Sequence, residues 1–259
     1  MIRLSRLMAV SGNEWRIVRK YQELVILLLI VPLVMMALVS KGIGAVVADV
    51  APEYHAAGAD FTVPGFTLMF GFMLIGFLGN GFMGEHGWGT WDRLRASSAR
   101  PSEVLLGKVL PYAGLSLAQF VLMLTVGWTF LGMHLRGSAI ALALLVIASV
   151  FLIISVSLAI TAFCSSGQQV SSFANLVGIV IGLVGGVFMP VAALPTWVRY
   201  MSPLTPQYWA MSGFRKVLAG NGTVTDIGVE LLILVGLSVV LFAIAARRFR
   251  FDESKRSLV

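Results

Sequence analysis

Hydrophobic residues gather along this sequence in long runs that alternate with shorter polar stretches. A helical run of about 20 apolar residues matches the thickness of the hydrocarbon core of a bilayer. The chain contains six such runs, so we predict six membrane-spanning helices, at residues 24–40, 64–83, 109–133, 138–163, 170–189 and 227–246. Pro32 lies within the first run, where a membrane helix tolerates it as a kink.

Composition indicates the same class of protein. The 259 residues are 58% hydrophobic and 12% charged, whereas a soluble domain averages about 25% charged residues. The chain therefore lacks the polar surface that contact with water requires. We predict an all-α membrane protein in which residues 1–259 form a single transmembrane domain, with no room for a second, soluble catalytic domain.

Basic residues are concentrated beside the ends of the predicted spans. This distribution of the net charge of +7 sets membrane topology and meets anionic lipid head groups, so the expected partner is membrane lipid and not nucleic acid. With both termini on one face, that face carries fourteen Lys and Arg residues and the opposite face five. The excess places both termini in the cytoplasm. The expected location is the inner or plasma membrane of a bacterial cell.

The first 22 residues are basic and have no early apolar core, so they do not match a cleavable signal peptide. We predict instead an amphipathic helix that lies on the cytoplasmic face of the membrane. Its apolar side is expected to consist of Leu4, Leu7, Met8, Trp15, Ile17 and Val18.

Residue types that perform catalysis or bind metals are scattered in this sequence. Cys164 is the one cysteine, which excludes a multi-cysteine metal site, and the three histidines lie in predicted loops. The sequence contains neither a His-Glu-x-x-His motif nor a phosphate-binding loop. We therefore expect no catalytic residue, metal site or cofactor in this chain. Glu230 lies inside the last span, where it either pairs with Lys216 near water or contributes to a substrate path.

The predicted cytoplasmic loop at residues 85–108 carries the strongest functional signal. Thr90 is a good N-cap and Asp92 suits the first turn of a helix, so we predict a short helix presented to the cytoplasm. A helix of this kind can dock on a partner. A short basic helix is also an ordinary feature of cytoplasmic loops, and composition alone leaves both interpretations open.

The same loop resembles that of type-2 ABC exporter permeases. The matching residues are Glu85, Gly89, Thr90, Arg93, Leu94, Ser97, Leu106, Gly107 and Lys108. A second similarity to the family lies at residues 185–190, 194–197, 202–209 and 213–215. The likeness extends to chain length, number of spans and order of loops.

Membership of that family would imply a definite assembly. Two permease subunits, identical or homologous, would join two ABC ATP-binding subunits, which bind the ATP and Mg. The loop helix would be a coupling helix that docks on the ATPase and transmits its motion to the spans. The residues implied in ATPase coupling are Glu85, Gly89, Thr90, Trp91, Asp92, Arg93, Leu94 and Arg95. Residues 190–225 would form short re-entrant or interfacial helices on the extracytoplasmic side.

The resemblance also implies a substrate path between the two permease subunits, along the second and fifth spans. Small residues at spacings of four let helices pack closely, either within the chain or against the second subunit. The candidates for the path or the subunit interface are Phe70, Phe77, Asn80, Phe173, Gly178, Gly182, Gly186 and Phe188. Because an apolar, methionine-containing lining suits hydrophobic cargo, we expect export of a hydrophobic drug, an antibiotic or a lipid-like molecule. The alternatives are a polysaccharide or glycolipid export permease, and a scaffold or assembly factor without transport.

Overall fold

A computed structural model of the protein describes residues 4–20, 26, 29–40, 42, 58–87, 96 and 100–248. Helices and the turns between them account for this part of the chain, and no strand occurs in it. The predicted all-α class is therefore confirmed for the described residues.

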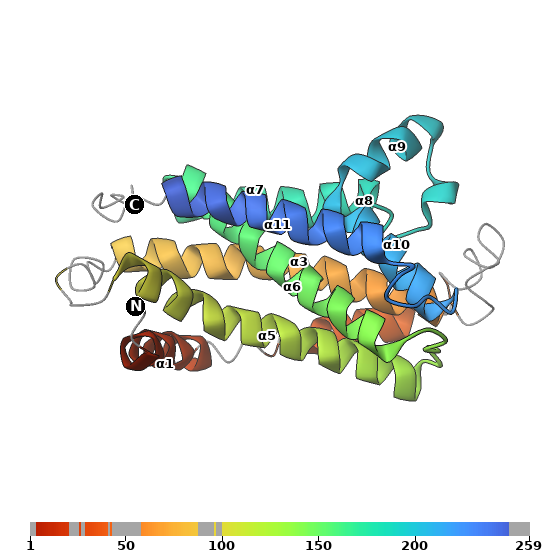
Figure 1. The fold of residues 1–259 in the computed structure, drawn as a ribbon, viewed down its shortest axis with the longest axis horizontal. Helices are drawn as coiled ribbons and strands as arrows, with labels where there is room; N and C mark the ends of the chain where they lie inside the picture. The colour runs from red at the N-terminus through yellow and green to blue at the C-terminus, as the bar shows by residue number, and fades with distance from the viewer. Residues whose placement is uncertain are drawn as a thin grey trace.

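Long helices run side by side along the length of the molecule (Figure 1). Their bounds are Ala59–Gly87 for α3, Pro101–Phe130 for α5, Ala139–Phe163 for α6 and Gly228–Arg248 for α11, with Gly167–Asn175 (α7), Leu176–Ile181 (η2) and Gly182–Val184 (α8) forming one further nearly continuous helix. Helix α1 (Leu4–Lys20) lies at one end of this bundle. At the other end lie η3 (Val191–Ala193), α9 (Thr196–Met201), η4 (Ser202–Leu204) and α10 (Pro206–Leu218). These two ends are termed the α1 end and the α10 end.

Five of the described helical segments are long and apolar enough to cross a membrane, which identifies a multi-pass membrane protein. They coincide with the second to sixth predicted spans. Part of the first predicted span, 24–40, forms the apolar helix Leu29–Ser40, which is shorter than a span. Residues 24, 25, 27 and 28 lie outside the described residues. Five spans are thus established, and the first predicted span stays a prediction.

Helix α3 forms the centre of the bundle. It contacts α5, α6 and α7, and 78% of its most apolar stretch is buried. The corresponding buried share is 22% both for α11 and for the segment Gly167–Val184. A helix that is apolar all round requires partners on every side. The latter two helices instead leave most of their surface to lipid or to another subunit.

Two helices are longer than the spans predicted from hydropathy. Helix α3 covers 59–87 where 64–83 was expected, and α5 begins at Pro101 where a start at 109 was expected. The predicted loop at 85–108 therefore includes the end of α3 and the first two turns of α5. The Glu103 carboxylate accepts a hydrogen bond from the Arg100 N–H at 2.9 Å and satisfies the start of α5. Hydropathy predicts only the apolar part of a membrane helix. The helix itself can continue beyond that part into polar surroundings, where the backbone groups at its end are capped.

Helix α1 packs one side against the bundle. Leu7, Glu14 and Val18 are buried, and the helix packs against α5. These positions lie seven and four residues apart, a spacing that keeps them on one side of a helix. Three members of the predicted apolar side are exposed instead: Leu4, Met8 and Trp15. The predicted apolar side therefore has members that pack against the bundle and members that stay exposed, and contact of the exposed ones with a membrane stays a prediction.

Short helices occupy the connection before the last span. Pro206 begins α10, a position at which a backbone N–H would have no partner within the helix, so the missing N–H of proline costs nothing. Pro195 precedes α9. Trp197 and Tyr200 of α9 are exposed, with 65% and 81% of their surfaces accessible. These are residue types that favour a membrane–water boundary. The location of these helices at such a boundary stays a prediction.

Candidate functional site

A buried ion cluster lies at the α1 end of the protein. The Nζ atom of Lys108 on α5 lies 2.9 Å from Glu14 Oε2 of α1 and 3.1 Å from Glu85 Oε1 of α3. The three side chains are at most 5% exposed, and the Tyr112 hydroxyl donates to Glu14 Oε1 at 3.4 Å. An ammonium group this deeply buried requires such partners, because an unpaired charge away from water is costly. The cluster therefore ties three helices together.

Glu85 is the predicted coupling residue that the described part of the chain contains. Its carboxylate binds Lys108 within the cluster, so Glu85 joins α3 to α5. The remaining predicted coupling residues lie outside the described residues: Gly89, Thr90, Trp91, Asp92, Arg93, Leu94 and Arg95. Their contact with an ATPase stays a prediction.

Nothing in the local sequence pairs Glu14 with Lys108, since they are 94 positions apart. Gly107 and Lys108 both belong to the family pattern, but the sequence alone does not explain what either residue does. The structure shows a role for each of them. Lys108 binds the two carboxylates, and Gly107 allows α1 to approach so closely that an added Cβ would lie 2.8 Å from Val10 Cβ. The signal that was available is Glu14 itself, an acidic residue in register with Leu7 and Val18.

A second polar surface lies on the exposed side of the α3–α7 pair. Asn80 Nδ2 of α3 donates to Ser171 Oγ of α7 at 2.9 Å. Phe173, two positions after Ser171 in the sequence, is 51% exposed. We term the exposed side chains of α3 and α7 in this region the α3–α7 surface: Asn80, Gln168, Gln169, Ser172, Phe173 and Asn175. Amide and hydroxyl groups on a span are poorly matched to lipid tails. The surface suits water, a substrate or a second subunit better.

The fifth predicted span is not a regular α-helix. It turns as the π-helix η2, where Gln207 Nε2 of α10 donates to the Val177 carbonyl at 3.1 Å. It then ends at Val184, five residues before the predicted end at 189. A π segment shifts the register of the residues that follow it, and such segments occur frequently at functional sites.

Because of this geometry, the three predicted glycines do not form one stripe. A Cβ on Gly178 would lie 3.9 Å from Phe72 of α3, which is an ordinary contact within the chain. A Cβ on Gly182 would meet nothing within 4 Å. Gly186 has a φ angle of +78° in the turn after α8, a left-handed conformation that favours glycine. Gly178 thus makes an ordinary contact within the chain, while Gly182 is buried and an added Cβ there would meet no atom within 4 Å.

The predicted aromatic residues divide in a similar way. Phe70 is buried and stacks on Phe66 with ring centroids 6.2 Å apart. Phe77 and Phe188 are partly buried against the core. From the predicted path set, Asn80 and Phe173 have exposed side chains, and they lie on different sides of α7, because Asn80 contacts Ser171 and a residue two positions further along a helix faces another way.

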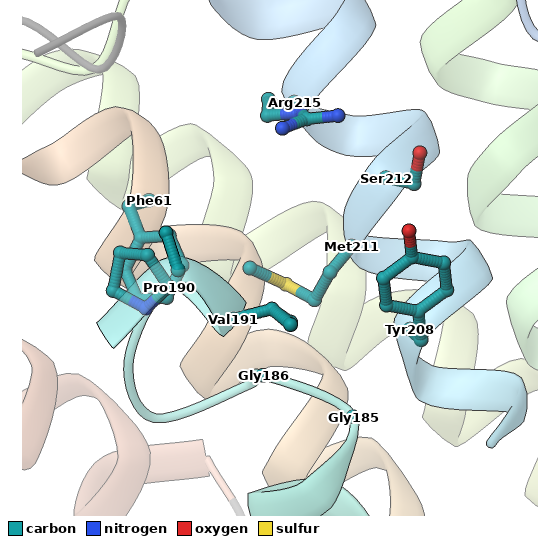
Figure 2. Close-up of a pocket in the computed structure, with 10 residues that line it drawn as sticks. Phe61, Gly185, Gly186, Pro190, Val191, Tyr208, Met211, Ser212 and Arg215 are labelled. Carbon is teal, nitrogen blue, oxygen red and sulfur yellow. The ribbon is translucent and has the colours of Figure 1, made fainter. Parts of the chain in front are cut away.

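A small cavity lies at the α10 end, between α3, α10 and the turn after α8 (Figure 2). Its volume is about 130 Å³. Phe61 and Met211 give it apolar walls, while Tyr208, Ser212 and Arg215 add polar groups along one side of α10. Sites for drug-sized ligands occupy roughly 300–1,000 Å³. This cavity is therefore too small to enclose such a molecule.

Polar contacts also join α10 to the start of α11. Lys216 Nζ lies 2.8 Å from Glu230 Oε1, which confirms the predicted pairing, and the Ser212 hydroxyl donates to the same oxygen at 2.9 Å. Just before α11, Thr223 donates through its hydroxyl and its N–H to Asp226 Oδ2, both at 2.7 Å. These bonds, the hydroxyl bond foremost, lower the pKa of Asp226.

In the part of the chain that the structure describes, no three His, Cys, Asp or Glu side chains are grouped to hold a metal ion.

Residues 48–247 match the family described as ABC-2 family transporter protein, which covers most of the chain. The chain belongs to the ABC-2 transporter family. The resemblance carried by the loop and by the fifth span is thereby confirmed.

Relatives of the chain include resistance permeases. The linearmycin resistance permease protein LnrN of Bacillus subtilis (strain 168) is 31% identical over 165 residues, which are 62% of this chain and 42% of LnrN. The daunorubicin resistance ABC transporter permease protein DrrB1 of Streptomyces coeruleorubidus is 24% identical over 258 residues, 96% of this chain and 89% of DrrB1. ABC transporter G family member 20 of Dictyostelium discoideum is 23% identical over 200 residues, 77% of this chain and 27% of that protein. The chain thus matches less than half of LnrN and nearly the whole of DrrB1.

Proposed function

We propose that this chain is the membrane-spanning permease subunit of an ATP-driven ABC exporter. The observation that carries the proposal is the family match over residues 48–247, together with an alignment along 96% of the chain to a daunorubicin resistance permease. Two separate ATP-binding subunits bind and hydrolyse the ATP with its Mg. The permease lies in the inner or plasma membrane of a bacterium with both termini in the cytoplasm, and its cargo is a hydrophobic drug, antibiotic or lipid-like molecule.

The α3–α7 surface is the proposed wall of the substrate path. Asn80 and Ser171 supply polar groups on one side of α7, and the exposed ring of Phe173 lies on another side of the same helix. A helix that offers both kinds of group suits a largely apolar cargo that carries a few polar groups. A second permease subunit supplies the opposite wall. The cavity at the α10 end is too small to take this role, and we propose that the path runs between the two permease subunits.

Coupling to the ATPase is assigned to residues 89–95, as the family pattern implies. Co-purification with an ATPase encoded beside the gene tests the assignment. We expect the ATPase to accompany the wild-type chain, and to be lost or to turn over more slowly with the Gly89→Pro/Arg93→Glu variant. Arg136→Glu is the matched control, because it reverses one exposed charge at the α10 end. Equal recovery and activity in both variants contradicts the coupling assignment; no ATPase from native membranes favours the scaffold interpretation.

Transport itself is tested in inverted vesicles, with daunorubicin as the probe. We expect ATP-dependent uptake that falls about tenfold, equivalent to ~1.4 kcal/mol, in Phe173→Ala. Leu232→Ala is the control, since Leu232 is 74% exposed on α11, away from the proposed path. Equal uptake by both variants would remove the α3–α7 surface from the path. ATPase binding without daunorubicin uptake would direct the search to polysaccharide or glycolipid substrates.

A further inference from the structure

Three charged side chains from three helices meet at the α1 end: Glu14 of α1, Lys108 of α5 and Glu85 of α3. Lys108 Nζ binds one oxygen of each carboxylate and lies 5.3 Å from the ring centroid of Phe82. The Lys108 side chain is 1% exposed. Surface ion pairs contribute little to stability, but a pair that is buried this far leaves an uncompensated charge when one partner is removed. The cluster is thus a firm connection between helices.

The cluster lies beside the segment that carries the predicted coupling residues. Glu85 precedes the last residue of α3, Gly87, by two positions, and Lys108 follows the first residue of α5, Pro101, by seven. The chain between Gly87 and Pro101 contains residues 89–95. Helix α1 is therefore joined to both of the helices from which that segment departs.

The outer side of α1 is basic as a result of this connection. Glu14 is the acidic residue of α1, and its carboxylate is turned inward to Lys108. The exposed side keeps the basic residues Arg16 and Arg19, and the Arg19 guanidinium lies 5.8 Å from the Trp15 ring centroid. One ion cluster thus fixes both the position of α1 and the basic character of its outer side.

We propose that Glu14, Lys108 and Glu85 form a joint that makes α1 and the facing ends of α3 and α5 move as one body. Lys108 is the positioning residue of this joint. Because Lys108 binds both carboxylates, its loss releases α1 and also separates α3 from α5, whereas loss of the Glu14 charge releases α1 alone. The role of this body in transmitting ATPase motion rests on the proposed function; the joint itself concerns the permease alone.

Spin-label distances test the joint in the full-length permease in nanodiscs, without an ATPase. In a Cys164→Ser background, labels at Ser5→Cys and Leu117→Cys report the position of α1 relative to α5, since both sites are exposed. We expect a single narrow distance in this chain and its loss in Lys108→Met. Arg16→Met, which removes an exposed cation from α1, is the matched control and keeps the narrow distance. A narrow distance in Lys108→Met overturns the proposal.

Two further variants guard against a Lys108→Met protein that does not fold. Glu14→Gln retains the Lys108–Glu85 pair, and it is expected to lose the narrow α1 distance. The charge swap Glu14→Lys/Lys108→Glu restores the narrow distance, while Glu14→Lys alone does not. An unchanged distance in Glu14→Gln, or a swap that fails to recover it, contradicts the ionic joint.

The ratio of daunorubicin transport to ATP hydrolysis separates a positioning role from a purely structural one. In the complex with its ATPase, Glu14→Gln is expected to keep ATP hydrolysis and to lower this ratio about 2- to 30-fold, the range for residues along a coupling network. A lower protein yield with an unchanged ratio overturns the positioning role. If the wild type shows no ATP-dependent transport, the proposed function fails, and the spin-label distances still decide whether the joint exists.

Discussion

Replacing Gly107 by alanine tests the placement of α1 against α5. A Cβ atom at this position would lie 2.8 Å from both Cβ and Cγ1 of Val10 and 3.1 Å from the Leu7 carbonyl oxygen. Carbon atoms in contact settle at about 3.5–4.0 Å, so α1 must move away by roughly 1 Å. The Lys108 Nζ to Glu14 Oε2 distance of 2.9 Å would then lengthen towards the limit of a hydrogen bond.

The expected cost follows from two opposing effects. Alanine in place of glycine favours a helix by about 0.5–1 kcal/mol. Overpacking of a close contact costs typically about 1–3 kcal/mol, and here the atoms in the way belong to the base of the Val10 side chain and to backbone, which cannot rotate aside. Gly107→Ala is therefore destabilising. Gly114→Ala on the same helix gains the helix-propensity term alone, because nothing lies within 4 Å of its added Cβ.

Thermal unfolding of the two purified variants in the same nanodiscs measures this difference. We expect the midpoint of Gly107→Ala to fall below that of the wild type and the midpoint of Gly114→Ala to stay equal or rise. Loss of α1 contacts is followed separately by faster proteolysis within residues 4–20. Equal midpoints and equal proteolysis for both variants would refute the close approach of α1 to α5.

Three further measurements probe other parts of the bundle. Ser157→Ala removes an interhelical hydrogen bond of 2.7 Å and should cost about 0.6–1.7 kcal/mol in unfolding assays, whereas Ser155→Ala, which removes a buried hydroxyl without a partner, should cost nothing. Lys216→Met leaves the Glu230 carboxylate buried without its cation and should lower the free energy of unfolding by about 1.5–3 kcal/mol, reduced by solvent screening because Lys216 is partly exposed. The loss should be larger than in the double variant Lys216→Met/Glu230→Gln, which removes both charges. Hydrogen bonds from a threonine hydroxyl and N–H lower the pKa of Asp226. The stability of that turn is therefore fully present above the ordinary pKa of about 3.9 and lost as the pH falls through the lower folded value; amide exchange should show this loss in the wild type and not in Asp226→Asn.

Hydropathy predicted the spans well because lipid imposes a simple requirement on composition. Each described helix that can cross a membrane overlaps one of the predicted apolar runs along most of its length. The helix ends escaped the same reasoning. Glu85 and Lys108 are charged and were assigned to a loop, although both lie inside helices. Both charges are compatible with helix interiors because Lys108 lies 3.1 Å from Glu85 and 2.9 Å from Glu14, so that each has a partner of opposite charge.

The burial of Glu14 could not be predicted from the sequence of α1 for a related reason. A helical pattern assigns every charged residue to the solvent side, and it cannot include a partner that is 94 residues away in sequence. Glu14 is buried because Lys108 is there to receive it. In the fifth span, the error came from assuming regular α-helical turns, since the π-helix at Leu176–Ile181 places Gly178 and Gly182 in different surroundings.

The proposed joint and the proposed substrate path meet on α3. Glu85 belongs to the ion cluster, and Asn80 belongs to the α3–α7 surface. Five residues of α-helix separate them, about 7.5 Å along the helix axis. Because α3 is the most deeply buried of the spans, a displacement of its Glu85 end cannot be absorbed by bending into lipid and must be carried to its neighbours. We expect the hydrogen bond from Asn80 to Ser171 to pass that displacement to α7, and the bond from Gln207 to the π-helix to pass it to α10. A motion imposed at the α1 end is thus expected to reach the path within two turns of one helix.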